Sequence, residues 1–184
     1  MSVGEQVVDQ LRDAVDDVRD RDLLDAAGVP AADVPPSGPW EAVPEGVDSG
    51  DAATVTTVED QAGFAFEVIA AKLTGRTQTV ARSRAGLHRD RAQQWAVAAG
   101  TVGTTSDPRR TSYALPPGLD DPAVAVRLAQ HTETSVAATY ADLVAWTAPG
   151  ARSAGVDALA EAWITAVAWG TAPVAFPGMP EQAG

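Results

Sequence analysis

The chain has 184 residues, enough for one domain with a substantial buried core and an appendage, and its 25 acidic and 13 basic side chains give a formal net charge of -12. Because it contains no cysteine, zinc ribbons, iron–sulfur clusters, thiol catalysis and disulfide frameworks are excluded. The negative charge repels nucleic acid and anionic lipid at long range, so we expect no nucleic-acid partner and no membrane partner.

We expect no targeting segment at the start of the chain, because the first ten residues, MSVGEQVVDQ, lack a basic region followed by a continuous apolar stretch. The longest mostly apolar run, residues 162–176, is interrupted by Gly170 and Pro173. It falls short of the roughly 20 residues that span a bilayer. We therefore expect a cytoplasmic protein without a membrane helix.

Residues 1–27 are predicted to form an additional, acidic N-terminal helix. Its apolar side chains follow one another at spacings of three or four residues, at Val8, Leu11, Val15 and Val18. This apolar stripe is narrow and the opposite face is rich in aspartate, so we expect the helix to dock on the chain's own bundle or, alternatively, on another protomer. Any homo-oligomer or protein partner is expected to use this helix.

Residues 28–50 are predicted to be a linker. Five prolines and four glycines lie between Gly28 and Asp51. Such a segment can hold neither a long helix nor an inner strand. Trp40 is expected to anchor the linker on the domain through its apolar ring.

Residues 51–184 are predicted to form a four-helix bundle with a C-terminal tail. Apolar side chains recur at helical spacing over four segments, at about residues 51–74, 78–99, 122–147 and 151–171. Short connections within the first pair and within the last pair predict two antiparallel hairpins. The tail is expected to fold back across one end of the bundle through Val174 and Phe176.

The two predicted hairpins are joined by a long connection, GTTSDPRRTSYALPPGLDD. Fully extended, its roughly 19 residues could reach about 60 Å. A helix of about 24 residues is only about 36 Å long. The connection can therefore traverse the whole bundle, or it can fold back at the same end.

Several short motifs and single residues follow one another along residues 51–181. They are Glu59 in VEDQAGFAFE, HRDR at residues 88–91, YALP at residues 113–116, Glu133, and the motif AFPGMPE. Over about residues 51–181 they resemble a bacterial ferritin-like domain family of unknown function that has an FPG-x-PE tail. The resemblance implies a ferritin-like four-helix bundle and no established activity. We therefore predict an all-α fold, a ferritin-like four-helix bundle with an additional N-terminal amphipathic helix.

The predicted helices carry residue types that a metal site in a bundle core uses. A ferritin-type dimetal centre takes a glutamate from each of two helices and a Glu-x-x-His motif from each of two others. The chain has only two histidines, His88 and His131, and Ala85 and Leu128 stand where the preceding glutamates should be. The di-iron signature is therefore not intact.

Glu59, His88 and Glu133 leave two interpretations open. Two carboxylates and one imidazole could form a mononuclear site for iron, manganese or zinc. However, Arg84 and Arg91 lie four residues before and three residues after His88, on the same helix face. A guanidinium there would repel a divalent cation. We therefore favour a buried polar cluster of Glu59, His88, Arg91 and Glu133, held by ion pairs and hydrogen bonds.

Other polar residues of the helices are expected to be structural. Glu67, two turns after Glu59, is assigned to a helix flank. The basic side of the second helix is assigned to a solvated face that pairs with acidic helices and not to a phosphate site; it comprises Arg76, Arg82, Arg84 and Arg89.

This pattern predicts no catalytic residue, no metal ligand and no cofactor. The predicted function is that of a ferritin-like bundle acting as a non-catalytic binding or interaction module; enzymatic activity stays open but is disfavoured, because no nucleophile elbow or phosphate loop occurs. The alternative is a mononuclear metal-binding protein, for metal handling or oxidase-like chemistry, that uses Glu59, His88 and Glu133. A third possibility is a small-molecule carrier with an apolar pocket, whose lining would include Trp95, Tyr140 and Trp163.

Overall fold

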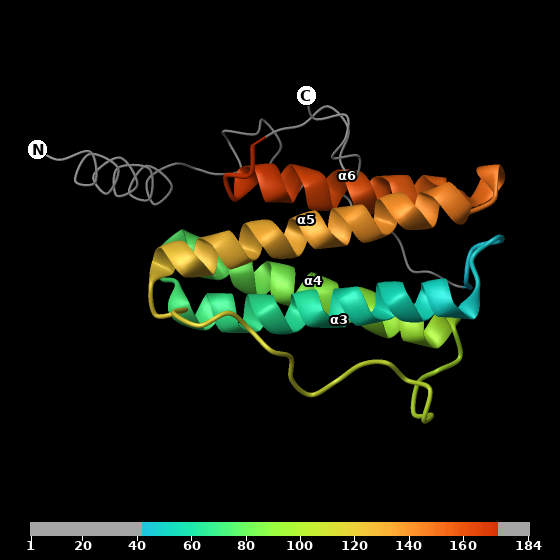
Figure 1. Cartoon of the computed structure of the whole chain (residues 1–184), viewed down its shortest axis with the longest axis horizontal. Coiled ribbons are helices and arrows are strands. Elements are labelled where there is room, and N and C mark those ends of the chain that lie inside the picture. Colours follow the sequence, from blue (N-terminus) through green and yellow to red (C-terminus); the bar gives the residue numbers. More distant parts are fainter. Residues whose placement is uncertain (1–41, 173–184) are drawn as a thin grey trace, which may run out of the picture.

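The computed structural model describes residues 42–172, and over this range the predicted all-α class is confirmed (Figure 1). No strand occurs within the described range. A short 3-10 turn, η1, precedes the last helix. The elements are α3 (Ser49–Lys72), α4 (Gly75–Ala98), α5 (Pro122–Trp146), η1 (Pro149–Ala151) and α6 (Ser153–Ala168).

Several predicted features lie outside the described residues. These are the N-terminal amphipathic helix, most of the linker with Trp40, and the tail with Val174 and Phe176. None of the helices between residues 42 and 172 is long and apolar enough to cross a bilayer.

The ends of α3 follow from its flanking residues. The Asp48 carboxylate accepts a hydrogen bond from the N–H of Asp51 (2.8 Å), and the Asp51 carboxylate accepts one from the N–H of Asp48 (3.4 Å). This reciprocal capping box satisfies two N–H groups at the start of the helix. The sequence predicts the end of the first helix at about residue 74 and the start of the second at about residue 78. In the structure α3 ends at Lys72, and Gly75, with a φ of 61°, begins α4. Glycine adopts this φ without strain, which permits a very short connection.

The two helical hairpins are joined by a segment that crosses the whole bundle. α3 packs antiparallel to α4, α5 packs antiparallel to α6, and α3 also packs against α5 (Figure 1). Residues 99–121 leave the end of α4 and run along the bundle to its opposite end, where α5 begins. Of the two courses that the sequence left open, the chain takes the crossover, so α4 and α5 run parallel. One long crossover between two hairpins is the connectivity of ferritin-like bundles.

The crossing segment is attached to α3 through the buried carboxylate of Asp60. Its Oδ2 accepts hydrogen bonds from the N–H of Arg110 (2.9 Å) and from the hydroxyl of Tyr113 (2.7 Å). The Tyr113 ring meets Phe64 edge to face, with centroids 5.9 Å apart. Arg89 of α4 pairs with the other oxygen, Oδ1 of Asp60. One carboxylate therefore connects α3, α4 and the crossing segment.

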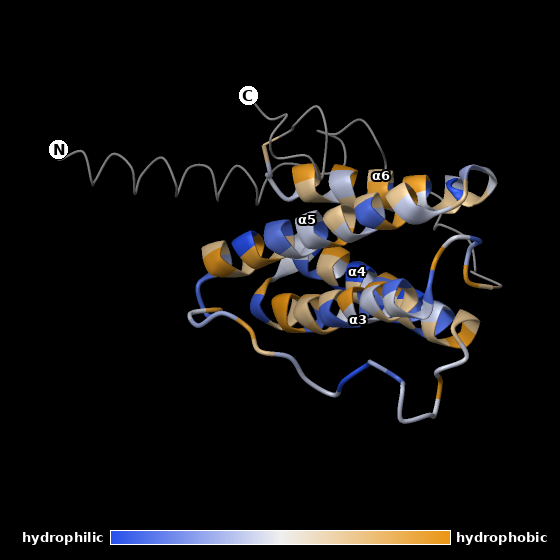
Figure 2. Ribbon diagram, turned by 45° about the vertical axis from the view of Figure 1, so that its right-hand side comes forward, coloured by the Kyte–Doolittle hydropathy of each residue, from blue (hydrophilic) through white to orange (hydrophobic). Residues whose placement is uncertain are grey.

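The apolar core consists of two clusters separated by a polar band. One cluster includes Val55, Trp95, Val136 and Tyr140. The other includes Phe66, Ile69, Leu128 and Trp169. Glu59, His88 and Glu133 lie between the two clusters along α3, α4 and α5. Figure 2 shows hydrophilic turns interrupting hydrophobic ones along these helices.

Candidate functional site

Six ionisable side chains from all four helices meet in the polar band. Arg84 is 9% exposed, Glu161 5% and Arg91 1%, and the other three are fully buried. Arg84, His88 and Arg91 share one face of α4 because they are spaced by four and three residues. We refer to the following set as the core cluster: Glu59 of α3, Arg84, His88 and Arg91 of α4, Glu133 of α5, and Glu161 of α6.

His88 lies at the centre of the core cluster. Its Nδ1 is 2.6 Å from Oε2 of Glu59, and its Nε2 is 3.4 Å from Oε1 of Glu133. The same Nε2 lies 3.3 Å from Nη2 of Arg84. The imidazole stacks on Phe66, with ring centroids 5.5 Å apart and planes inclined by 11°. The ring is thus fixed on its edges by carboxylates and on one face by an aromatic side chain.

Arg84 joins the two carboxylates that come from the second hairpin. Its Nε and Nη2 donate to Oε1 and Oε2 of Glu133 at 2.7 and 2.9 Å, a bidentate arrangement. Its Nη1 donates to Oε1 of Glu161 at 2.5 Å. Paired N–H donors on a carboxylate fix direction as well as charge. Arg84 therefore ties α4 to α5 and α6 at once.

Glu59 and Glu161 are also held by other side chains. Arg91 donates through Nη2 to Oε2 of Glu161, and its Nη1 lies 4.0 Å from Oε1 of Glu59. The Tyr140 hydroxyl donates to Oε1 of Glu59 at 2.6 Å. The Trp95 indole N–H in turn donates to the Tyr140 hydroxyl at 3.2 Å. Each carboxylate of the core cluster therefore faces at least two donors.

The pKa values of His88, Glu133 and Glu59 are shifted toward the charged forms. Burial disfavours charge on His88, but the charges of Glu133 and Glu59 outweigh it and raise its pKa. Burial likewise opposes ionisation of Glu133, yet Arg84 and His88 bring its pKa down to about 2. The pKa of Glu59 is lowered against the effect of burial, chiefly by His88. Burial and the charge of Glu59 raise the pKa of Tyr140 well above 10.0, so this phenol stays a neutral donor.

With every group charged, the core cluster has no net charge. Its three carboxylates are matched by two guanidinium groups and one imidazolium ion. Because an unmatched charge is expensive to bury, this balance is what a sealed ionic core requires.

Metal binding would compete with these pairs. Glu59, His88 and Glu133 offer two carboxylates and an imidazole, donor types that suit iron, manganese or zinc. However, Arg84 takes both oxygens of Glu133, and Nδ1 of His88 is directed at Glu59. Among residues 42–172, no group of three or more His, Cys, Asp and Glu side chains is arranged to hold a metal ion. A metal could enter only by displacing a guanidinium.

The sequence placed some of these residues differently. It predicts that Arg91 pairs with Glu59 and Glu133. Arg91 Nη1 lies 4.0 Å from Oε1 of Glu59, but Glu133 is bound by Arg84, and Arg91 donates to Glu161. The sequence also predicts a solvated face for Arg84, and this is wrong, because Arg84 is almost completely buried. Its helical spacing from His88 was the signal for a place in the core. Glu161 had a comparable signal, since it lies among small buried residues of α6, Ala158 and Ala162.

The remaining assignments concern the helix surface and the expected carrier pocket. Glu67 is exposed and accepts hydrogen bonds from Arg89, as expected for a helix flank. Trp95 and Tyr140 are fully buried and hydrogen-bonded to each other, whereas Trp163 is half-buried. They belong to the packed core; a cavity of the bundle lies elsewhere, between α3 and α5.

Comparison with known proteins identifies a family without a known function. The sequence pattern of a family described as a domain of unknown function, DUF4439, matches residues 52–181. No curated protein and no solved structure matches the chain.

Proposed function

Because the chain belongs to the DUF4439 family of domains of unknown function, we propose its role from its geometry: a cytoplasmic, ferritin-like bundle that acts as a non-catalytic binding or interaction module. In this proposal, the core cluster takes the place that a dimetal centre has in ferritin-like proteins. The bidentate contact between Arg84 and Glu133 is the observation that most directly supports this replacement. A guanidinium at the centre of the carboxylates supplies the positive charge that metal ions would otherwise supply.

The burial of the core cluster supports a non-catalytic role. A catalytic group must reach its substrate, within hydrogen-bond distance of the proton that it transfers. The six side chains of the core cluster are at most 9% exposed, and their charges are engaged with one another. The core therefore serves stability, and the surface is where this bundle would meet its ligands or partners.

A mononuclear metal protein is the second candidate. It draws on one observation, the contact of His88 with both Glu59 and Glu133. For this candidate to hold, Arg84 would have to leave Glu133 when the metal binds.

Elemental analysis separates the two candidates. The protein is purified without an affinity tag after growth with iron, manganese and zinc, together with the variants His88→Ala and His131→Ala. We expect far less than one metal atom per chain in all three proteins. Stoichiometric metal that disappears in His88→Ala but persists in His131→Ala would overturn the proposal and establish a metal site in the core. Metal lost only in His131→Ala would indicate adsorption at an exposed histidine.

A further inference from the structure

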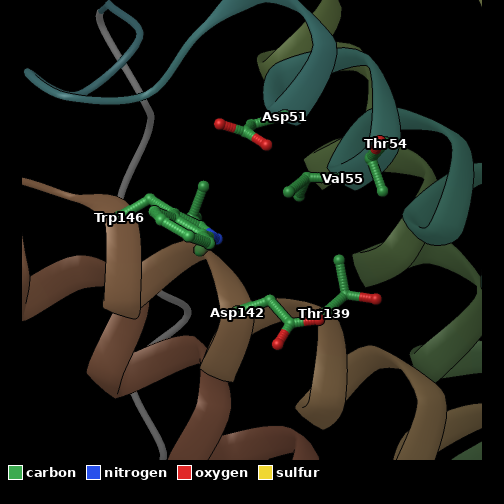
Figure 3. Close-up of a pocket in the computed structure, with 7 residues that line it drawn as sticks. Asp51, Thr54, Val55, Thr139, Asp142 and Trp146 are labelled. Atoms are coloured by element: carbon green, nitrogen blue, oxygen red, sulfur yellow. The ribbon is translucent and has the colours of Figure 1, made fainter.

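A cavity of about 360 Å³ lies between the first turns of α3 and the last turns of α5 (Figure 3). It shares no residue with the core cluster. Cavities of this size hold small organic molecules. The lining residues are Asp51, Thr54 and Val55 from α3, and Thr139, Asp142, Leu143 and Trp146 from α5.

The charge of this cavity is negative. Asp51 of α3 and Asp142 of α5 border it from opposite sides (Figure 3). No basic side chain lines it, and neither aspartate forms an ion pair with any residue of the described range. Trp146 is the last residue of α5, so the negative end of that helix dipole also lies here. The positive end of α3 is already capped by Asp48 and Asp51. The two carboxylates and the end of α5 therefore give the cavity a negative potential, which attracts a cation.

The hydrogen-bonding groups of the lining are mostly acceptors. The Thr54 hydroxyl donates its proton to the carbonyl oxygen of Gly50 (2.9 Å), and the Thr139 hydroxyl donates to that of Ser135 (2.9 Å). Neither hydroxyl proton is therefore available to a ligand. The Trp146 indole N–H remains as a side-chain donor, and this ring is 69% exposed. Such a lining favours a ligand that brings its own N–H groups.

The apolar part of the lining narrows the ligand class further. Val55 and Leu143 are buried side chains at the wall of the cavity, and the Trp146 ring of α5 lies across it from Val55 of α3 (Figure 3). A hydrated metal ion gains nothing from such surfaces. An alkyl chain gains burial, and an ammonium group near the indole gains cation–π attraction.

We propose that this cavity binds a small alkyl diamine in its doubly protonated form, with its ammonium groups at Asp51 and Asp142 and its alkyl chain against Trp146. An ammonium group has three N–H donors and no acceptor, which matches this lining. Amine binding in this cavity rests on the proposed function as a binding module and specifies the class of ligand. The cavity contains no residue of the core cluster. The metal analysis therefore tests only the core, and the titration with amine tests only the cavity.

The test is isothermal titration calorimetry of the full chain with 1,4-diaminobutane, with n-butanol as the uncharged probe of the same chain length and with calcium chloride as the metal probe. We expect saturable 1:1 binding of the diamine with a Kd of about 1 mM or below, and no saturable binding of the other two. Asp142→Asn should weaken diamine binding at least about tenfold, and Trp146→Ala at least about threefold. Both residues are exposed, so neither change should disturb the fold.

The matched control is Asp157→Asn, which removes the same charge from an exposed position of α6 outside the cavity. Its Kd should stay within about twofold of the wild-type value. Equal losses in Asp157→Asn and Asp142→Asn would mean non-specific attraction to an acidic surface, and would overturn the proposal. So would saturable binding of calcium that depends on Asp142, or the absence of saturable diamine binding.

Discussion

Arg84 and Glu133 form the contact that joins the two hairpins at the centre of the bundle. The guanidinium Nε lies 2.7 Å from Oε1 and Nη2 lies 2.9 Å from Oε2, and both side chains are almost completely or completely buried. α4 and α5 run parallel and belong to different hairpins, and only the crossing segment connects them. The pair therefore links two helices that are not neighbours in one hairpin. It is therefore a tertiary contact, which forms when the hairpins assemble.

We predict that Glu133→Ala destabilises the protein strongly. The substitution leaves Arg84 and His88 without their shared carboxylate in a buried site. Removing one partner of a buried ion pair typically costs about 3–5 kcal/mol of unfolding free energy. Urea denaturation followed by circular dichroism measures the effect. A melting temperature and a denaturation midpoint equal to those of the wild type would refute the buried-cluster interpretation.

Two further variants separate charge from packing. The double variant Arg84→Met with Glu133→Leu removes both partners and should lose less stability than the sum of the single changes, because no charge is left unmatched. Asp120→Ala removes a solvent-exposed pair with Lys72. This exposed pair is expected to contribute little, so the melting temperature should hardly change.

The stability of the protein should be highest at mildly acidic pH. Glu133 has a pKa of about 2 in the folded chain against 4.5 when unperturbed, so its contribution is complete above pH 4.5 and is lost as the pH falls toward 2. His88 has a raised pKa relative to 6.5, so its contribution is complete below pH 6.5 and is lost as the pH rises through the raised value. We therefore expect the free energy of unfolding to be maximal between pH 4.5 and 6.5, as measured by urea titrations across the pH range.

His88→Gln tests the alkaline half of this profile. Glutamine keeps a polar side chain of similar reach but cannot carry the charge. The variant should be less stable than the wild type at pH 5, and its stability should decline less above pH 6.5. His131→Gln, at an exposed position, should retain the wild-type profile. An unchanged alkaline decline in His88→Gln would assign that decline to another group.

The helices could be predicted from the sequence because they depend on local periodicity, whereas the pairing inside the core could not. Glu59, His88 and Glu133 stand out as polar residues on apolar faces; in the structure His88 lies 2.6 Å from Glu59 and 3.4 Å from Glu133. Which arginine reaches Glu133 depends on the relative register of α4 and α5, and this register is set by the crossing segment and by packing. The second helix, predicted from about residue 78, begins at Gly75, whose positive φ a glycine adopts without strain.

Tyr113 provides a test of the crossing segment. Tyr113→Phe removes the hydrogen bond to Asp60 and keeps the ring against Phe64. A hydrogen bond to a charged group typically contributes about 1.5–3 kcal/mol, and less where it is partly exposed. We expect a small loss of stability and faster amide hydrogen exchange at residues 109–114, with exchange in α5 unchanged. Protection of these amides at the wild-type level would show that Asp60 does not hold the segment through Tyr113.

Gly63 is predicted to be required where the side chain of Arg89 crosses α3. A Cβ at Gly63 would stand 2.7 Å from Cδ and 2.8 Å from Cγ of Arg89, and Arg89 cannot easily retreat because it is held by Asp60 and Glu67. Gly86 of α4 is also inside a helix, but a Cβ there would meet nothing within 4 Å.

Helix propensity alone favours alanine over glycine by about 1 kcal/mol. Gly86→Ala should therefore raise the free energy of unfolding by about that amount. Gly63→Ala should lower it, or at best leave it unchanged, because Arg89 is displaced from its carboxylates. Equal stabilisation by the two substitutions would mean that the Arg89 side chain moves aside without loss, and that its contacts with Asp60 and Glu67 contribute nothing to stability.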